Sequence, residues 1–210
     1  MKILIADDHT IVRSGLKHIL ELEFPQVLIG EATSCAELLQ RAHTARWDVV
    51  ILDVALGAEN GLTVLPQLKA AYPSLPVIVL SMYGERQFVV RALADGASAY
   101  LTKEQAADEE LFKAIRTVCA GRRYLGAALA EQLADHFGGD HGGKPHEALS
   151  TRELEVFLLL AAAKSVSEIA ERLHLSVKTV STYRTRILEK MALKSNAEII
   201  QYAVRNGLVG

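Results

Sequence analysis

The sequence has few cysteines and no long apolar run. Its two cysteines, Cys35 and Cys119, fall inside predicted helices, so we expect reduced thiols with a structural role rather than a disulfide. A membrane-spanning helix needs about 18 consecutive apolar residues, and no such stretch occurs. The first ten residues, MKILIADDHT, carry acids where a signal peptide has its apolar segment. We therefore expect a soluble, cytoplasmic protein that is not exported.

Apolar and charged residues are abundant, but the charge is unevenly spread. Of the 210 residues, 50% are hydrophobic and 23% are charged, which is typical of a globular protein with little disorder. The net charge is −2 for the whole chain. Residues 1–147 carry 14 Lys and Arg against 19 Asp and Glu, whereas residues 148–210 carry 9 against 6. An acidic first part and a basic second part predict two domains with different partners.

A segment rich in glycine and histidine, HFGGDHGGKPHEA at residues 136–148, separates the two parts. Glycine, proline and polar residues without periodicity are typical of a linker. The histidines and Asp140 do not have the spacing of zinc ligands, so we interpret the segment as solvated chain. We predict a first domain over residues 1–120, a linker over 121–147 with a helix at about 126–137, and a second domain over 148–210.

The first 120 residues alternate short apolar runs with segments of helical period. The apolar runs predict strands at residues 3–6, 27–30, 49–52, 77–80 and 98–101. The helical segments lie at about residues 10–22, 34–44, 60–71, 85–96 and 108–120. Such βα units predict a doubly wound α/β domain with a five-stranded parallel sheet and helices on both faces. Functional residues of these sheets gather where the strands end.

Polar residues stand at the ends of four of these strands. They are Asp7 and Asp8 after the first strand, Asp53 after the third, Ser81 after the fourth and Lys103 after the fifth. Three carboxylates at one edge repel one another unless a cation neutralises them, and their hard oxygen atoms suit Mg²⁺. An aspartate between a cation and phosphate-binding groups can attack phosphorus and form an aspartyl phosphate. The alternative is that these acids cap helix N-termini.

Four motifs carry a family resemblance. ILIADDHTIVRSGL, DVVILDV, VIVLS and GASAYLTKE resemble the receiver domain of bacterial two-component response regulators, over about residues 1–120. The resemblance implies a flavodoxin-like fold, a Mg²⁺ cofactor and a sensor histidine kinase as partner. The implied roles are a phosphoacceptor, Asp53; metal-site groups, Asp7, Asp8, Asp53 and the backbone carbonyl of Ala55; and phosphoryl-binding or switch residues, Ser81, Tyr100 and Lys103.

Two positions depart from the usual receiver pattern. Many receivers have proline four residues after the phosphoacceptor and again after the lysine, where this chain has Gly57 and Glu104. Glycine leaves more conformations open, so we expect a looser loop after the third strand. Neither change removes a chemical group from the site. Two positions after Asp53 and Ser81 stand Ala55 and Tyr83, which predict slow self-dephosphorylation because alanine cannot position a water and a tyrosine ring can cover the site.

The basic second part has the pattern of four helices. Ser150 is a natural N-cap, with Glu153 at the spacing of a capping box. SVSEIAERLH and SVKTVSTYRTRILEKM, joined by a tight turn, predict a helix-turn-helix. At 100° per residue, Val177, Val180, Ile187, Leu188 and Met191 fall on one face of the second of these helices. The other face carries Lys178, Thr179, Thr182, Thr185, Arg186 and Lys190. A basic face with short hydroxyl residues suits phosphate and base contacts in a DNA groove, although solvated surface helices look similar.

This part also resembles a known family. LSTRELEV, EIAERL, SVKTV and the AE that opens the last helix resemble the LuxR-type DNA-binding domain of NarL/FixJ response regulators, over about residues 148–210. The resemblance implies that Lys178, Thr179, Thr182, Thr185 and Arg186 lie where DNA contacts are made. It also implies that the last helix, at about residues 196–206, supports a homodimer.

Together the two resemblances predict a phosphorylation-dependent transcription regulator that binds double-stranded DNA. It would not be an enzyme, apart from phosphotransfer to its own Asp53 and slow self-dephosphorylation. One alternative is a regulator of the same family that binds DNA without phosphorylation. Another is a receiver that acts through protein contacts alone, which would not need the basic helix-turn-helix. An aspartate-nucleophile phosphatase typically has an acid two residues after the nucleophile, where this chain has Ala55.

Overall fold

The computed structural model describes residues 1–57, 59–82, 86–104, 106, 109–126, 130 and 144–209. The chain divides into two compact units, Met1–Gly138 and Gly139–Gly210. Most of the predicted helix at about residues 126–137 lies outside the described residues, as does Tyr83. None of the helices in the described ranges combines the length and the apolar character that crossing a membrane requires.

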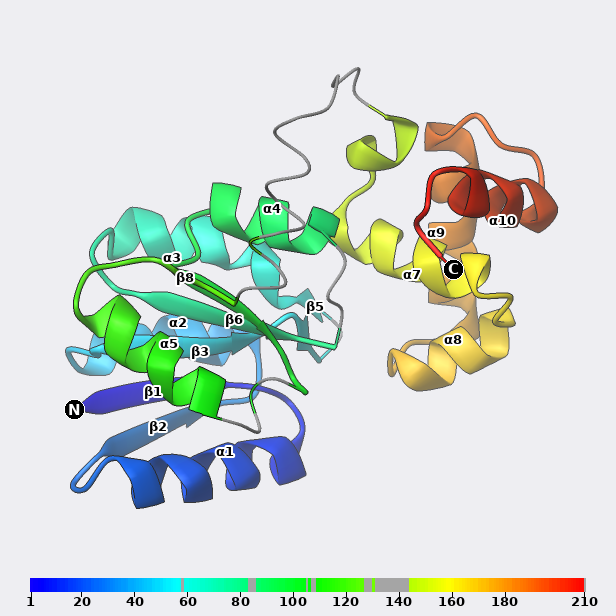
Figure 1. Cartoon of the computed structure of the whole chain (residues 1–210). Helices are drawn as coiled ribbons and strands as arrows, with labels where there is room; N and C mark the ends of the chain where they lie inside the picture. The colour runs from blue at the N-terminus through cyan, green and yellow to red at the C-terminus, as the bar shows by residue number, and fades with distance from the viewer. Residues whose placement is uncertain are drawn as a thin grey trace. The chain divides into compact units, whose positions relative to one another are not determined.

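A parallel sheet forms the centre of the first unit (Figure 1). Its strands are β1 (Lys2–Ala6), β2 (Leu28–Ala32), β3 (Val49–Asp53), β6 (Val77–Ser81), β7 (Ala99–Thr102) and β8 (Tyr124–Leu125). The order β2-β1-β3-β6-β7-β8 confirms the doubly wound α/β fold. The direction of winding reverses between β1 and β3, which creates a crevice at their carboxyl ends. The first five of these strands are the predicted ones, and β8 is an addition that the sequence pattern did not reveal.

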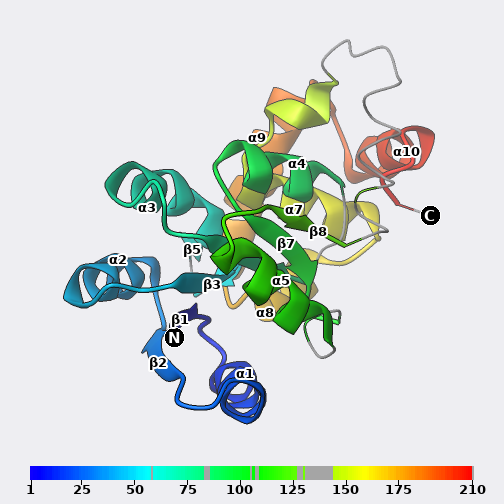
Figure 2. The same cartoon turned by 60° about the vertical axis from the view of Figure 1, so that its left-hand side comes forward.

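Helices cover both faces of the sheet (Figure 2). They are α1 (Thr10–Glu23), α2 (Cys35–Thr44), α3 (Leu65–Ala71), α4 (Arg86–Ala94) and α5 (Glu109–Cys119). α1 and α5 bury Leu16, Leu20 and Ile115 against one face, where alternate residues of the strands meet them. All five residues of β3 and of β6 are buried. Their apolar runs therefore reflect strands that are covered on both faces.

A short hairpin follows Asp53 and approaches it closely. Ala55–Leu56 (β4) pairs antiparallel with Glu59–Asn60 (β5), and a 3₁₀ turn, η1 (Gly61–Thr63), leads into α3. The amide nitrogen of Gly61 donates to the carbonyl of Val54 at 2.7 Å. A Cβ atom at Gly61 would lie only 2.0 Å from the carbonyl oxygen of Asp53. Only glycine fits here, because the backbone passes directly over the end of β3.

The second unit is helical. It contains a 3₁₀ turn, η3 (Pro145–Ala148), and the helices α7 (Thr151–Ala161), α8 (Val166–Arg172), α9 (Val177–Lys190) and α10 (Asn196–Arg205). Ser150 and Glu153 form the predicted capping box, and Ser165 and Glu168 form a second one at the start of α8. Each box satisfies two backbone donors that a helix N-terminus leaves free. The chain turns from α8 into α9 within four residues, as a helix-turn-helix requires.

His146 belongs to the second unit, although its sequence context is that of a linker. The side chain is buried, and its Nδ1 lies 2.8 Å from the hydroxyl oxygen of Tyr202 on α10. The rings of His146 and Tyr202 also make an edge-to-face contact, and Tyr202 makes another with Phe157 of α7. These contacts hold η3 against the packed helices.

Two glycines of the first unit give opposite expectations for the same substitution. Gly61→Ala should lower the free energy of unfolding by about 2 kcal/mol or more, because the new methyl group meets the backbone of Asp53. A methyl group added at Gly15, within α1, would have no atom of the described residues within 4 Å other than those of its chain neighbours and of the adjacent backbone of α1. Gly15→Ala should therefore stabilise the protein by up to about 1 kcal/mol through helix propensity. Urea unfolding of both variants measures the difference, and equal stabilities would contradict the close approach at Gly61.

Candidate functional site

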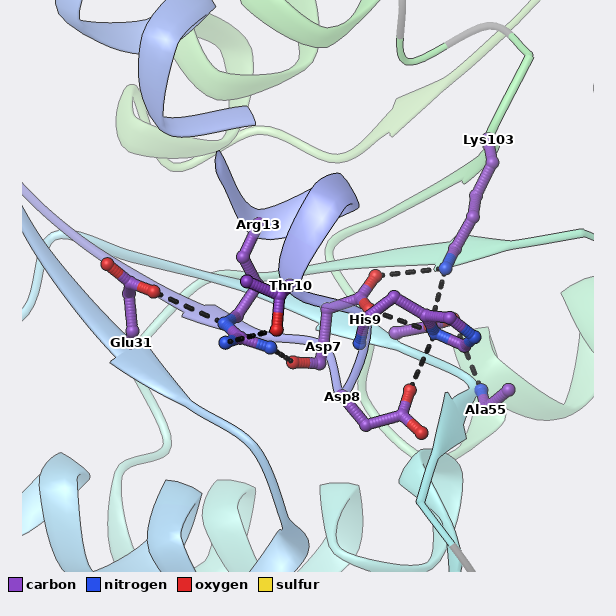
Figure 3. A network of polar contacts seen from close by, with 9 residues as sticks. Asp7, Asp8, His9, Thr10, Arg13, Glu31, Ala55 and Lys103 are labelled. Carbon is purple, nitrogen blue, oxygen red and sulfur yellow. Dashed lines mark hydrogen bonds and ion pairs between the residues drawn. The ribbon is translucent and has the colours of Figure 1, made fainter. Parts of the chain in front are cut away.

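Three carboxylates meet at the crevice between β1 and β3. Asp7 and Asp8 directly follow β1, and Asp53 is the last residue of β3. Together with His9 they offer ligand atoms that all lie within 4.8 Å of one another. Asp7 and Asp53 are almost fully buried. The predicted convergence of these three acids is thus what the fold produces, and Figure 3 shows part of the network around them.

Lys103 supplies the positive charge at this edge (Figure 3). Its Nζ lies 2.5 Å from Oδ2 of Asp53 and 2.9 Å from Oδ2 of Asp7. The residue follows β7, and its backbone nitrogen donates to the carbonyl of Ser81 at 2.7 Å. Burial alone would lower the pKa of Lys103, but the charges and hydrogen bonds of Asp53 and Asp7 outweigh burial and raise it. The side chain is therefore a permanent ammonium between two acids.

The electrostatic balance leaves Asp53 reluctant to ionise. Burial, reinforced by the charge of Asp7, raises the pKa of Asp53 to about 7, although Lys103 and the backbone N–H of Ala55 act in the opposite direction. The amide of Ala55 donates to Oδ1 of Asp53 at 3.1 Å. One ammonium is thus not enough to neutralise the cluster, and a further cation would favour the ionised form.

The residues fit a divalent, hard cation. The three carboxylates are close enough to share one ion, and carboxylate oxygens are what Mg²⁺ prefers. Oδ1 of Asp8 is buried and accepts no hydrogen bond within the described part of the chain, while Nδ1 of His9 lies 2.7 Å from it. Oδ1 of Asp7 accepts a hydrogen bond from the backbone of His9 at 2.7 Å. Both oxygens of Asp7 thus accept hydrogen bonds, from His9 and from Lys103, whereas Oδ1 of Asp8 faces the imidazole of His9.

Ser81 and Tyr100 lie on β6 and β7, the two strands that follow β3 in the sheet. Ser81 is the last residue of β6. This strand pairs with β3 on one side and with β7 on the other, where Ser81 is in register with Thr102. Tyr100 is a fully buried residue of β7. Ala55, two positions after Asp53, is half-buried in the hairpin. Gly57 adopts a positive φ of 66°, so glycine suits the turn of that hairpin better than the proline of many receivers, whose φ is always negative.

Arg13 is a site residue that the sequence pattern did not single out. Its guanidinium is buried, and its Nη1 donates to the backbone carbonyl of Asp7 at 2.8 Å (Figure 3). Its Nε donates to Glu31 of β2 at 3.2 Å. These bonds tie the end of β1 to α1 and hold the chain that carries Asp7. The signal was present, since Arg13 stands three and seven residues before the buried Leu16 and Leu20.

The second unit presents a polar face on α9. The exposed residues form one stripe along the helix and are Val177, Lys178, Ser181, Thr182, Thr185, Arg186, Glu189 and Lys190. Val180, Ile187 and Met191 are buried on the opposite side, as the helical angles predict. Thr179 is half-buried, and its hydroxyl contacts that of the N-cap residue Ser176 at 2.7 Å. The predicted contact residues therefore share a surface, with Thr179 at its edge.

Three side chains of α9 have surroundings that the sequence pattern did not indicate. Val177 was expected on the buried face but is 51% exposed, because it is the first residue of the helix and lies one turn ahead of the buried Val180. Lys190 lies with its Nζ 2.6 Å from Glu153 of α7. Arg184 is half-buried and donates through Nε to Asn196 of α10 at 2.6 Å. The last two contacts fasten α9 to its neighbouring helices.

Comparison with known families covers nearly the whole chain. Residues 3–116 match the response regulator receiver domain, and residues 147–203 match the bacterial regulatory proteins of the luxR family. The response regulator GacA of Pseudomonas aeruginosa is 38% identical over 211 residues, which cover 100% of this chain and 98% of that protein. The oxygen regulatory protein NreC of Staphylococcus carnosus is 34% identical over 216 residues, covering 100% of this chain and 99% of the relative.

Solved structures give the same result. The RcsB response regulator of Salmonella typhimurium is 26% identical with a TM-score of 0.59, and the match covers 97% of this chain and 98% of the other. RcsB of Salmonella enterica serovar Typhimurium bound to promoter rprA in the presence of the phosphomimetic BeF3− is 29% identical, with a TM-score of 0.61 and coverages of 96% and 98%. Another RcsB structure, 26% identical with a TM-score of 0.60 and coverages of 97% and 98%, holds two dimers on two parallel DNAs.

The raised pKa of Asp53 predicts a pH dependence of stability when no divalent cation is present. In the unfolded chain this carboxyl has its ordinary pKa of 3.8, whereas in the fold it is about 7. Between these values the folded state binds more protons than the unfolded state, so the free energy of unfolding should fall as pH rises. From about pH 5.5 to about pH 8 the loss should be on the order of 2 kcal/mol. Thermal unfolding in EDTA measures it.

Asp53→Asn does not titrate and should lack this fall. Glu109→Gln, at an exposed position of α5, is the control and should behave as the wild type does. A fall of equal size in Asp53→Asn would show that another group causes it.

Proposed function

Because this chain belongs to the NarL/FixJ family of response regulators with a LuxR-type DNA-binding domain, we propose that it is a transcription regulator whose DNA binding is controlled by phosphorylation of Asp53. One observation carries the proposal. A single aspartate, Asp53, lies at the crevice beside two further acids and 2.5 Å from the ammonium of Lys103. That arrangement offers a nucleophile, a cation site and a phosphate-binding group within one edge of the sheet.

In the proposed reaction a carboxylate oxygen of Asp53 forms a bond to phosphorus while the bond between phosphorus and its donor breaks. The donor is a phosphohistidine of a sensor kinase or a small acyl phosphate. A bound Mg²⁺ would supply positive charge that neutralises the acids and the phosphoryl oxygens, and Asp7, Asp8, Asp53 and the carbonyl of Ala55 would hold it. The chain would catalyse no reaction on other molecules, apart from slow hydrolysis of its own aspartyl phosphate.

Phosphorylation would change the partners of Lys103. Its ammonium now bonds two carboxylates, and a phosphoryl dianion on Asp53 would offer it a stronger, charge-assisted acceptor. The hydroxyl of Ser81 would turn to the same phosphoryl group. Lys103 and Ser81 are joined by a backbone hydrogen bond, so their movement is coupled to β7 and to its buried Tyr100. We propose that this coupling carries the signal out of the site.

The second unit would then bind DNA through the exposed face of α9. Lys178 and Arg186 would neutralise phosphates, while Thr182 and Thr185 would lie near the base edges. Thr179, half-buried beside the N-cap, and Lys190, paired with Glu153, would contribute less. A homodimer would engage two half-sites about one helical turn apart. Such a regulator would act in the cytoplasm, where the chromosome and the kinase's catalytic part are found.

Phosphoryl labelling tests the assignment of Asp53. With acetyl phosphate and Mg²⁺, intact-protein mass spectrometry should show one added phosphoryl group on the wild type and none on Asp53→Asn. Asp95→Asn, in the loop after α4, is a matched control and should label normally. Lys103→Ala should still label, since the ammonium does not form the new bond, but its DNA affinity should no longer respond to labelling. Equal labelling of the wild type and Asp53→Asn would refute the assignment.

Salt titrations test the DNA-binding face. Lys178→Ala should weaken binding to every duplex and reduce the slope of log affinity against log salt by about one, as loss of one phosphate contact does. Lys190→Ala should change this slope much less, because its ammonium is already paired with Glu153 at 2.6 Å. Binding curves for one selected and one scrambled duplex at several salt concentrations measure both slopes. If the slope were the same for Lys178→Ala and the wild type, Lys178 would not contact a DNA phosphate.

A further inference from the structure

The hydroxyl groups on the exposed face of α9 are turned back onto their own helix. Oγ1 of Thr182 donates to the carbonyl of Lys178 at 3.0 Å, and Oγ1 of Thr185 donates to the carbonyl of Ser181 at 3.1 Å. This is the i to i−4 bond that threonine commonly forms within a helix. The hydroxyl proton, which is the only one that threonine can donate, is used in both residues.

The hydroxyls of these side chains therefore have no proton left to donate, and the γ-methyl groups are free to contact a partner. Thr182 and Thr185 are both exposed, so nothing within the described chain encloses them. Val177, at the start of the same stripe, adds an apolar side chain that is 51% exposed. These exposed groups do not stabilise the isolated domain, because an apolar group stabilises a fold only when it is buried. The exposed stripe of α9 thus carries three side chains that offer methyl groups, Val177, Thr182 and Thr185.

Two cationic side chains lie on the same stripe as these methyl groups. Lys178 and Arg186 are exposed on the same side of α9, and residues 148–210 carry 9 Lys and Arg against 6 Asp and Glu. A surface that combines methyl groups with cations fits the major groove of DNA, where phosphates border the bases. The major groove displays one apolar group, the C5-methyl group of thymine, and apolar side chains recognise it by contact.

We propose that Val177, Thr182 and Thr185 recognise thymine through its C5-methyl group, and that the threonines contribute methyl contacts rather than hydrogen bonds. The inference rests on the proposed DNA-binding function and specifies what the helix reads. The N-terminal half of a recognition helix is the part that meets base edges, which is where Val177 lies. The specificity of the protein then depends on positions of thymine in each half-site.

The competing interpretation is that each threonine hydroxyl accepts a hydrogen bond from a base amino group, since its lone pairs are still available. The two interpretations predict opposite effects for two conservative variants. Thr182→Ser keeps the hydroxyl and removes the methyl group, whereas Thr182→Val keeps the methyl group and removes the hydroxyl. The same pair can be made at Thr185.

The experiment uses the full chain with Mg²⁺ and beryllofluoride, a phosphoryl mimic. A binding sequence is first selected from a randomised duplex library, and each of its thymines is then replaced in turn by deoxyuridine. Uracil pairs with adenine as thymine does but lacks the methyl group. At the contacted positions the wild type should lose about fourfold in affinity per methyl group, which corresponds to the burial of one such group.

The variants assign each methyl contact. Three variants should each abolish the loss of affinity caused by deoxyuridine at one thymine position: Thr182→Ser, Thr185→Ser and Val177→Ala. A double-mutant cycle between side chain and base measures this coupling. Thr182→Val should keep the loss. Ser181→Ala, on the same exposed stripe but without a methyl group to lose, is the control and should leave every position unchanged. Unaltered affinity for a scrambled duplex shows that each variant is folded.

Three results would overturn the inference. The wild type could bind the thymine and deoxyuridine duplexes equally, or Thr182→Ser could retain the full loss, or Thr182→Val could abolish it. In each of these cases the protein has still selected a DNA sequence from the library. The proposed DNA-binding function is then retained, and only the proposed contact with the thymine methyl group is refuted. If the library yields no enriched sequence with or without beryllofluoride, the DNA-binding function itself is refuted.

Discussion

The first unit depends on how it neutralises carboxylates that the fold forces together. The switch in winding between β1 and β3 brings Asp7, Asp8 and Asp53 to one crevice, where burial and mutual repulsion oppose their ionisation. Lys103 bridges two of them, and Arg13 holds the backbone that carries Asp7. Lys103 therefore compensates the repulsion only in part, and a bound divalent cation would favour the ionised form of the acids. For the proposed phosphorylation this matters, because an ammonium held between competing acids could exchange one of them for a phosphoryl group.

Much of the fold was predictable because burial leaves a plain trace in the sequence. The apolar runs that became β3 and β6 are continuous since both faces of these strands are covered, and the strand-end acids follow from them. The capping box at Ser150 was predictable for a similar reason, since it needs only two residues at a fixed spacing. The place of Asp53 at the crevice likewise follows from its position at the end of a buried strand.

The features that escaped prediction depend on contacts between distant segments or on chain ends. β8 has only two residues, which is too short for any periodicity, and Arg13 finds its partner at the end of β1 rather than beside it in sequence. The helical angle of Val177 places it on the apolar face of α9. It is nevertheless exposed, because the first turn of α9 extends beyond the helices that cover the remainder of that face. The sequence did not indicate that the threonine hydroxyls of α9 donate to backbone carbonyls of the preceding turn, because threonine in a helix has more than one rotamer.

β8 determines which strand an isolated receiver exposes at the edge of its sheet. Its two residues pair in parallel with Ala99 and Tyr100 of β7, and β7 would otherwise be the edge of the sheet at that point. An edge strand with free amide and carbonyl groups invites pairing with another molecule. A truncated receiver that stops at residue 120 would uncover β7 and tend to aggregate, whereas one that continues past Leu125 would carry its own edge protection.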